Sequence, residues 1–128
     1  MKRDMELLRK ILFYFEKRES DELVTPEDII AGREVIIEGY DGRLVSDHVD
    51  VMYEGSLLEG YADKAKDGRL IKVYPTRLTW QGHEFLAAAR NEGVWERARE
   101  TASANSLNLP FKILHSLLTK YIAHEVGL

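Results

Sequence analysis

The sequence predicts an α+β domain in which several helices accompany a single β-hairpin. Apolar residues recur at helical spacing over residues 3–19 and again after Pro110, which indicates two amphipathic helices. Between them, Asp67-Gly68 separates two strand-like arms, the pattern of a β-hairpin. The chain has 128 residues, 45% of them hydrophobic, and no cysteine, so it can bury a core without disulfides or thiolate metal sites.

Three helices and one short strand are predicted in the first half of the chain. The helix over residues 3–19 is followed by a short helix that begins at Thr25-Pro26, a hydroxyl cap followed by proline, and ends at Gly32. The β-branched run at residues 35–37 indicates a short strand.

The third helix is predicted to begin at a Ser46 cap and to run from Asp47 to about Glu54. Its inward side carries three residues: Val49, Met52 and Tyr53. Gly55 is predicted to end this helix, because glycine takes the left-handed backbone conformation without steric cost.

The hairpin arms are predicted at residues 57–64 and 69–75, and a proline ends the second arm. Thr79 is placed to cap a helix over residues 80–90, in which Trp80 is expected to be a buried core residue. This arrangement connects the hairpin directly to the next helix.

We place the domain boundary between residues 92 and 93. Residues 1–92 form the hairpin-containing domain, and residues 93–128 form a C-terminal helical extension. The final helix has a continuous apolar stripe from Ile113 to Ile122, which either packs on the first helix or forms a homodimer interface. Analogy with related folds favours the dimer.

The order of these elements is that of a winged helix, and two segments carry the resemblance. Residues 46–59 resemble the recognition-helix segment of bacterial winged-helix regulators, in which a helix ends at glycine and two apolar residues lead into the hairpin, or wing. Residues 74–86, Tyr-Pro-Thr-Arg-Leu-Thr-Trp-Gln-Gly-His-Glu-Phe-Leu, resemble the strand of these proteins that exits into the following helix.

The chain also resembles one family over most of its length. The opening Met-Lys-Arg-Asp-Met-Glu-Leu-Leu-Arg-Lys-Ile-Leu, the Leu-Thr-Trp-Gln-Gly-His-Glu-Phe-Leu segment at residues 78–86 and the closing helix are similar to an uncharacterised domain-of-unknown-function family of small bacterial and phage proteins. The resemblance implies a winged-helix-like fold and a phage or bacterial context. It implies no activity.

The sequence contains no evident catalytic or metal-binding constellation. The chain has four histidines: His48, His83, His115 and His124. No two are three or four positions apart, so they indicate surface or hydrogen-bonded structural histidines rather than metal ligands. Ser46, Asp47 and His48 are consecutive, and neighbours on a helix do not face one another as a catalytic triad requires. We therefore expect a non-enzymatic protein without a cofactor or metal.

Charge is divided unevenly along the chain, although the formal net charge is only −4. Residues 21–60 carry eleven acidic residues against two arginines, a net charge of −9. The predicted third helix carries Asp47, Asp50 and Glu54 and no lysine or arginine. Because DNA binding needs cations at the phosphates, this helix is not expected to read the major groove.

The hairpin carries the opposite charge. The predicted nucleic-acid-binding residues are Lys64, Lys66, Arg69 and Lys72, with Arg43 and Arg77 secondary. Cations on a wing can contact phosphates or the minor groove without a helix in the major groove. The sequence therefore favours a regulatory protein that contacts DNA mainly through its wing. The same cations would also suit a solvated hairpin whose charges prevent edge-to-edge aggregation.

A protein partner is the alternative. The acidic surface of residues 21–60, centred on Asp47, Asp50 and Glu54, would dock a host or phage protein without any DNA binding. The chain has no uncharged apolar run of the length that a membrane helix requires, so we expect a cytoplasmic protein with no membrane contact.

Overall fold

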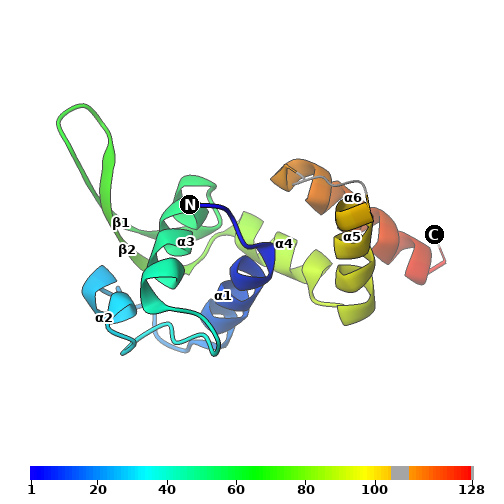
Figure 1. Ribbon diagram of the computed structural model, residues 1–128, viewed down its shortest axis with the longest axis horizontal. Coiled ribbons are helices and arrows are strands. Elements are labelled where there is room, and N and C mark those ends of the chain that lie inside the picture. Colours follow the sequence, from blue (N-terminus) through cyan, green and yellow to red (C-terminus); the bar gives the residue numbers. More distant parts are fainter. Residues whose placement is uncertain (105–109, 128) are drawn as a thin grey trace. The chain divides into compact units, whose positions relative to one another are not determined.

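The computed structural model describes residues 1–104 and 110–127 (Figure 1). Along the chain, the elements are α1 (Met5–Lys17), α2 (Pro26–Ile30), α3 (Gly42–Glu54), β1 (Leu58–Lys64), β2 (Leu70–Leu78), α4 (Trp80–Ala89), α5 (Glu92–Ala104) and α6 (Phe111–Glu125). β1 and β2 form a two-stranded antiparallel sheet. The predicted α+β class, with one hairpin, is confirmed.

The chain forms two compact units, Met1–His83 and Glu84–Leu128, so the division falls inside α4. The predicted domain boundary between residues 92 and 93 stays a prediction. The hairpin and helices α1 to α3 belong to the first unit, where the hairpin projects beyond α3 (Figure 1).

The first unit is built around α1. The buried apolar residues of this helix are Leu7, Leu8, Ile11, Leu12 and Phe15. They recur at the spacing that places one face of a helix inward, and α1 contacts both α3 and β2. The predicted amphipathic helix is therefore confirmed.

His48 joins the start of α1 to α3. Its ring is fully buried, Nε2 accepts a hydrogen bond from the Asp4 backbone N–H at 2.8 Å, and Nδ1 lies 2.9 Å from the Leu44 carbonyl oxygen. A backbone N–H can only donate and a carbonyl can only accept, so the proton lies on Nδ1. The interpretation of this residue as a hydrogen-bonded structural histidine is confirmed.

The segment between α1 and α3 differs from prediction at one point. Thr25 caps α2 as expected, with Oγ1 accepting from the Asp28 N–H at 3.1 Å. The predicted strand at residues 35–37 is wrong, since these residues form no strand and Val35 has a φ of +51°. Val35 and Ile37 are buried while Ile36 is 63% exposed, so the alternation comes from a loop that inserts two side chains into the core.

The start of α3 also differs. The helix begins at Gly42, where the Asp41 carboxylate accepts from the Arg43 N–H at 2.9 Å, and Ser46 is a buried residue inside it. The prediction of Ser46 as the cap is wrong. Gly42 packs directly against the backbone carbonyls of Ile29 and Ile30, which leaves no room for a side chain.

α3 ends in a Schellman motif. The Leu57 N–H donates to the Met52 carbonyl at 2.8 Å, and the Ser56 N–H donates to the Tyr53 carbonyl at 3.0 Å. Ser56 occupies the left-handed conformation, with a φ of +62°, whereas Gly55 has a φ of −82°. The helix therefore ends where predicted, but the prediction that Gly55 takes the left-handed conformation is wrong.

The hairpin turns at the predicted place. The Gly68 N–H donates to the Ala65 carbonyl at 2.9 Å, the Ala65 N–H donates to the Arg69 carbonyl at 2.8 Å, and Gly68 has a φ of +85°. These contacts describe a three-residue loop in which glycine supplies the left-handed conformation. Asp67 accepts from the Arg69 N–H at 3.0 Å and so tightens the turn.

β2 continues past Pro75 to Leu78, so the prediction that Pro75 ends this strand is wrong. Gly60 lies opposite Pro75 and Glu59 lies opposite Arg77, which makes Thr76 the extra residue of a bulge. Proline is tolerated at a bulge because no ladder hydrogen bond is lost there. On the outer edge of β2, the Pro75 carbonyl accepts from the Val24 N–H at 3.0 Å.

Thr79 caps α4 as predicted, with Oγ1 accepting from the Gly82 N–H at 3.0 Å. Trp80 is not a core residue, since it is 76% exposed. The buried face of α4 begins at Gly82, and Trp80 precedes it by two positions, which places Trp80 on the opposite side of the helix. In the second unit, Phe85 and Trp95 are fully buried and meet edge to face, with ring centroids 6.5 Å apart.

α6 packs on α5 within the second unit. The Tyr121 hydroxyl lies 2.9 Å from Thr101 Oγ1, and the Arg97 guanidinium lies 4.0 Å from the centre of the Tyr121 ring. Leu114 and Leu118 are buried, whereas Ile113 is 53% exposed, so this packing covers part of the predicted stripe. Dimerisation through α6 stays a prediction.

Gly82→Ala tests the close contact between α4 and the end of α3. Alanine is favoured over glycine inside a helix by about 1 kcal/mol. A Cβ at this position, however, would overlap the Leu57 carbonyl oxygen, a backbone atom that cannot rotate away. We expect the variant to lose about 1–3 kcal/mol of unfolding free energy, measured by urea denaturation.

The matched control is Ala87→Gly, at an exposed position of the same helix. It reports helix propensity alone, and we expect it to lose about 1 kcal/mol. A Gly82→Ala variant as stable as the wild type would contradict the close-contact explanation.

Candidate nucleic-acid interface on the hairpin

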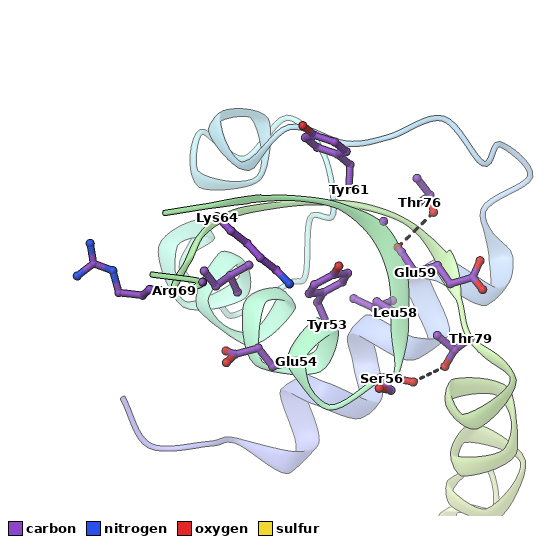
Figure 2. Close-up of a pocket in the computed structure, with 13 residues that line it drawn as sticks. Tyr53, Glu54, Ser56, Leu58, Glu59, Tyr61, Lys64, Arg69, Thr76 and Thr79 are labelled. Carbon is purple, nitrogen blue, oxygen red and sulfur yellow. Dashed lines mark hydrogen bonds between the residues drawn. The ribbon is translucent and has the colours of Figure 1, made fainter. Parts of the chain in front are cut away.

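A groove of about 1030 Å³ runs along β1 beside the last turn of α3 (Figure 2). Its lining comes from the end of α3, from β1, from the hairpin tip and from the bulge and end of β2. All of these residues belong to the first compact unit. The groove exists because the Schellman motif brings the chain directly from the last turn of α3 into β1.

Tyr53 and Lys64 face each other across this groove. Tyr53 lies in the last turn of α3, is partly exposed and points into the groove, and the Lys64 side chain is directed inward from β1 (Figure 2). The Arg69 guanidinium points outward from the hairpin tip (Figure 2). Leu58, which is buried, contributes apolar surface to the lining.

The six cations predicted to bind nucleic acid divide into three sets. Lys64, Lys66 and Arg69, here called the tip cations, are exposed and have no ion-pair partner among residues 1–104 and 110–127. Two of them, Lys64 and Arg69, line the groove. The tip cations are therefore available to a ligand.

Lys72 and Arg77 are engaged in ion pairs, Lys72 near the tip end of β2 and Arg77 near the base of the hairpin. Lys72 Nζ lies 2.5 Å from Glu27 Oε1, and Arg77 Nε lies 2.5 Å from Glu59 Oε2. The hydrogen bond between Lys72 and Glu27 lowers the pKa of the carboxyl and raises the pKa of the lysine. These two cations attach the hairpin to α2 and to its own neighbouring strand.

Arg43 is not brought to the groove. It lies in the first turn of α3, at the opposite end of the helix from Tyr53 and Glu54. Lys72 does not line the groove either. It lies across from Asp63 in the strand register, and because it is next to buried Val73 its side chain is on the opposite face of β2 from Val73. The structure thus unites only part of the predicted cationic set.

The predicted acidic residues lie on one face of α3. We call these three residues, Asp47, Asp50 and Glu54, the acidic face. They are spaced three and four positions apart, which places them on the same side of the helix. None of them has an ion-pair partner in the described part of the chain. Burial raises the pKa of Asp50 to about 6, with smaller contributions from the charges of Asp47 and then Glu54. Of the three, Glu54 lines the groove.

Tyr53 is the groove residue that sequence reasoning missed. Its position at the inward spacing of α3 indicated a core residue, and Val49 and Met52 are indeed buried. Tyr53 remains partly exposed because it lies in the final turn, where the hairpin rather than the core faces the helix. The sequence feature that could have indicated this position is the short connection from the last turn of α3 to β1, which brings the hairpin next to Tyr53.

The described residues show neither a metal-binding cluster nor a membrane-spanning helix. Within residues 1–104 and 110–127, no group of three or more histidine, aspartate or glutamate side chains is arranged to hold a metal ion. No helix in that part of the chain combines the length and apolar character needed to cross a membrane.

Asp50→Asn tests the electrostatic cost of the acidic face. The folded protein holds a proton on Asp50 up to about pH 6, whereas the ordinary pKa is 3.8, so ionised Asp50 destabilises the fold above that range. After allowance for solvent screening, we expect the variant to gain about 1 kcal/mol of unfolding free energy at pH 7.5. The gain should disappear as the pH falls from 6 to below 4.

Glu54→Gln is the matched control, because it removes a charge from the same face at an exposed position. Urea denaturation at pH 7.5 and pH 3.8 should give a smaller gain for this variant. A gain for Asp50→Asn that is independent of pH would contradict the titration.

Comparisons with known proteins agree with the family resemblance. A family model described as "Hypothetical protein (DUF2513)" matches residues 2–108. An "Uncharacterized protein" of Haemophilus influenzae (strain ATCC 51907 / DSM 11121 / KW20 / Rd) is 30% identical over 130 residues, covering 99% of this chain and 100% of the relative. No solved structure matches. The predicted membership in a family of unknown function is confirmed, and the chain belongs to the DUF2513 family.

Proposed function

We propose that this protein is a non-enzymatic, winged-helix regulatory protein that contacts nucleic acid through the tip of its hairpin. The winged-helix interpretation is supported by the order of three helices followed by a hairpin and a capped helix. It is also supported by the chain between α1 and α2, where Val24 hydrogen-bonds to the outer edge of β2. This edge contact fixes the hairpin to the helical core.

The observation that carries the proposal is the division of the cations. The hairpin uses Lys72 and Arg77 for its own attachment, while the tip cations are exposed and unpaired in the described residues. Three adjacent free cations on a projecting hairpin can replace the counterions of a phosphate backbone. Their release would supply affinity without sequence readout.

The approach of the nucleic acid follows from the charge of α3. This helix presents Asp47, Asp50 and Glu54, and its one basic side chain, Arg43, lies at the far end from the hairpin. Carboxylates placed against phosphates would be repelled. The hairpin would therefore lead the contact and α3 would remain outside the major groove.

Lys66→Glu with Arg69→Glu tests this function. The double variant replaces two tip cations by acids, so we expect no measurable binding to random-sequence duplex DNA in a low-salt gel shift. If weak binding remains, the slope of log affinity against log salt should fall by about 2, because each lost phosphate contact contributes about 0.9.

The matched control is Lys112→Glu with Lys120→Glu, which makes the same change in net charge at exposed positions of α6. We expect this variant to bind as the wild type does. An unchanged affinity in the Lys66 and Arg69 double variant would overturn the proposed site.

A protein partner is the second candidate, and the acidic face favours it. Three carboxylates without an ion-pair partner in the described part of the chain lie on one side of α3. The raised pKa of Asp50 means that a cationic partner would relieve an existing electrostatic cost. The test is a pull-down that survives nuclease treatment, combined with a low-salt gel shift. Retention of the partner by the wild type, its loss in an Asp47→Asn, Asp50→Asn and Glu54→Gln variant, and no gel shift would favour this function.

A further inference from the structure

We propose that the groove between α3 and β1 binds one unpaired base of a single-stranded nucleic acid, together with the phosphates on either side of that base. This inference rests on the proposed function and assigns the form of nucleic acid that the hairpin prefers. Tyr53 would be the stacking platform, and the tip cations Lys64 and Arg69 would contact the phosphates.

The shape of the groove fits a nucleotide rather than a duplex. Its volume of about 1030 Å³ is slightly above the range of about 300–1,000 Å³ that is typical of small-molecule sites, and it is an open groove. The groove opens beside the tip cations, so a backbone that follows these cations passes its mouth. A base that is paired and stacked within a duplex cannot turn into such a groove without being flipped out.

Tyr53 presents an aromatic surface that the fold itself does not use. In the described residues, its ring has no aromatic partner and its hydroxyl has no hydrogen-bond partner. By contrast, Tyr61 and Tyr74 contact each other, with ring centroids 5.9 Å apart. An available ring in a concave, cationic setting is what single-stranded nucleic acid recognition requires.

The polar groups around Tyr53 specify the ligand further. Thr76 Oγ1 donates to the Glu59 carbonyl at 3.2 Å, and Thr79 Oγ1 donates to the Ser56 carbonyl at 2.5 Å, so both hydroxyl protons are already used. The charged side chains of the lining that have no ion-pair partner among the described residues are Lys64, Arg69 and Glu54, whereas Glu59 is paired with Arg77. Two cations suit phosphates, and one carboxylate suits an exocyclic amine of a base.

The experiment compares Tyr53→Leu with Tyr40→Leu in the full-length chain. Tyr40 is the matched control, because it is also partly exposed but does not line the groove and lies just before α3, at the opposite end of that helix from Tyr53. The probes are a fluorescent, mixed-sequence DNA strand of about twelve nucleotides and the same strand annealed to its complement. Affinities are measured by anisotropy at low salt.

We expect Tyr53→Leu to bind the single strand about 5- to 100-fold more weakly than the wild type, since one stacked base is lost. Duplex binding should change by less than about twofold, because phosphate contacts at the tip remain. Tyr40→Leu should bind both probes as the wild type does. Tyr53→Phe keeps the ring and should retain single-strand affinity, which separates stacking from a folding defect.

The other outcomes distinguish failure of the groove inference from failure of the proposed function. Equal single-strand affinity in Tyr53→Leu and the wild type overturns the groove inference, as does an equal loss on both probes. If the Lys66→Glu with Arg69→Glu variant still loses binding in those cases, the proposed function stands without it. If the wild type binds neither probe at low salt, the proposed function fails and the groove inference fails with it.

Discussion

The backbone of Leu57 is the point on which the first unit depends. Its N–H donates to the Met52 carbonyl at 2.8 Å and so closes the end of α3. Its carbonyl accepts from the Thr79 N–H at 3.1 Å, where β2 passes into α4, and lies directly against Gly82. The backbone of one residue therefore connects the last turn of α3, both ends of the hairpin and the first turn of α4.

This junction explains two local features that propensity alone does not. Ser56 adopts the left-handed conformation, which costs a residue with a side chain about 1 kcal/mol, and it persists because the Ser56 carbonyl is bound by Thr79 Oγ1. Gly82 is inside a helix, where glycine is disfavoured, because the Leu57 carbonyl leaves no room for Cβ. The left-handed backbone of Ser56 and the glycine inside α4 each lower the stability locally, and both allow α3, the hairpin and α4 to meet at Leu57.

The groove is a consequence of that junction. Because only three residues, Gly55, Ser56 and Leu57, separate α3 from β1, Tyr53 and Glu54 face the inner side of the hairpin that carries Lys64. The hairpin is then held at its base by Arg18, whose guanidinium donates to the Thr76 carbonyl at 3.0 Å, and farther along β2 by the pair of Lys72 with Glu27. The strands therefore carry ion-paired cations, whereas Lys64, Lys66 and Arg69 have no ion-pair partner among the described residues.

The acidic face of α3 imposes a cost on the same unit. Burial is the main cause of the raised pKa of Asp50, and repulsion by the like charges three and four positions away adds to it. This cost to stability is the observation on which the proposed protein-binding function rests. The two proposed partners would bind at different places, because the cations at the hairpin tip favour the phosphates of a nucleic acid and the acidic face of α3 favours a cationic protein.

The sequence by itself determined the α+β class, the amphipathic α1, the caps at Thr25 and Thr79, the hairpin turn at Gly68 and the division of charge between α3 and the hairpin. These features depend on periodicity, capping and turn chemistry, which act over a few residues. Tertiary structure decided that residues 35–37 form a loop, that Trp80 is exposed, that Lys72 and Arg77 are paired and that Tyr53 lines a groove. Each of these depends on which distant segment lies opposite, and local pattern carries no information about that partner.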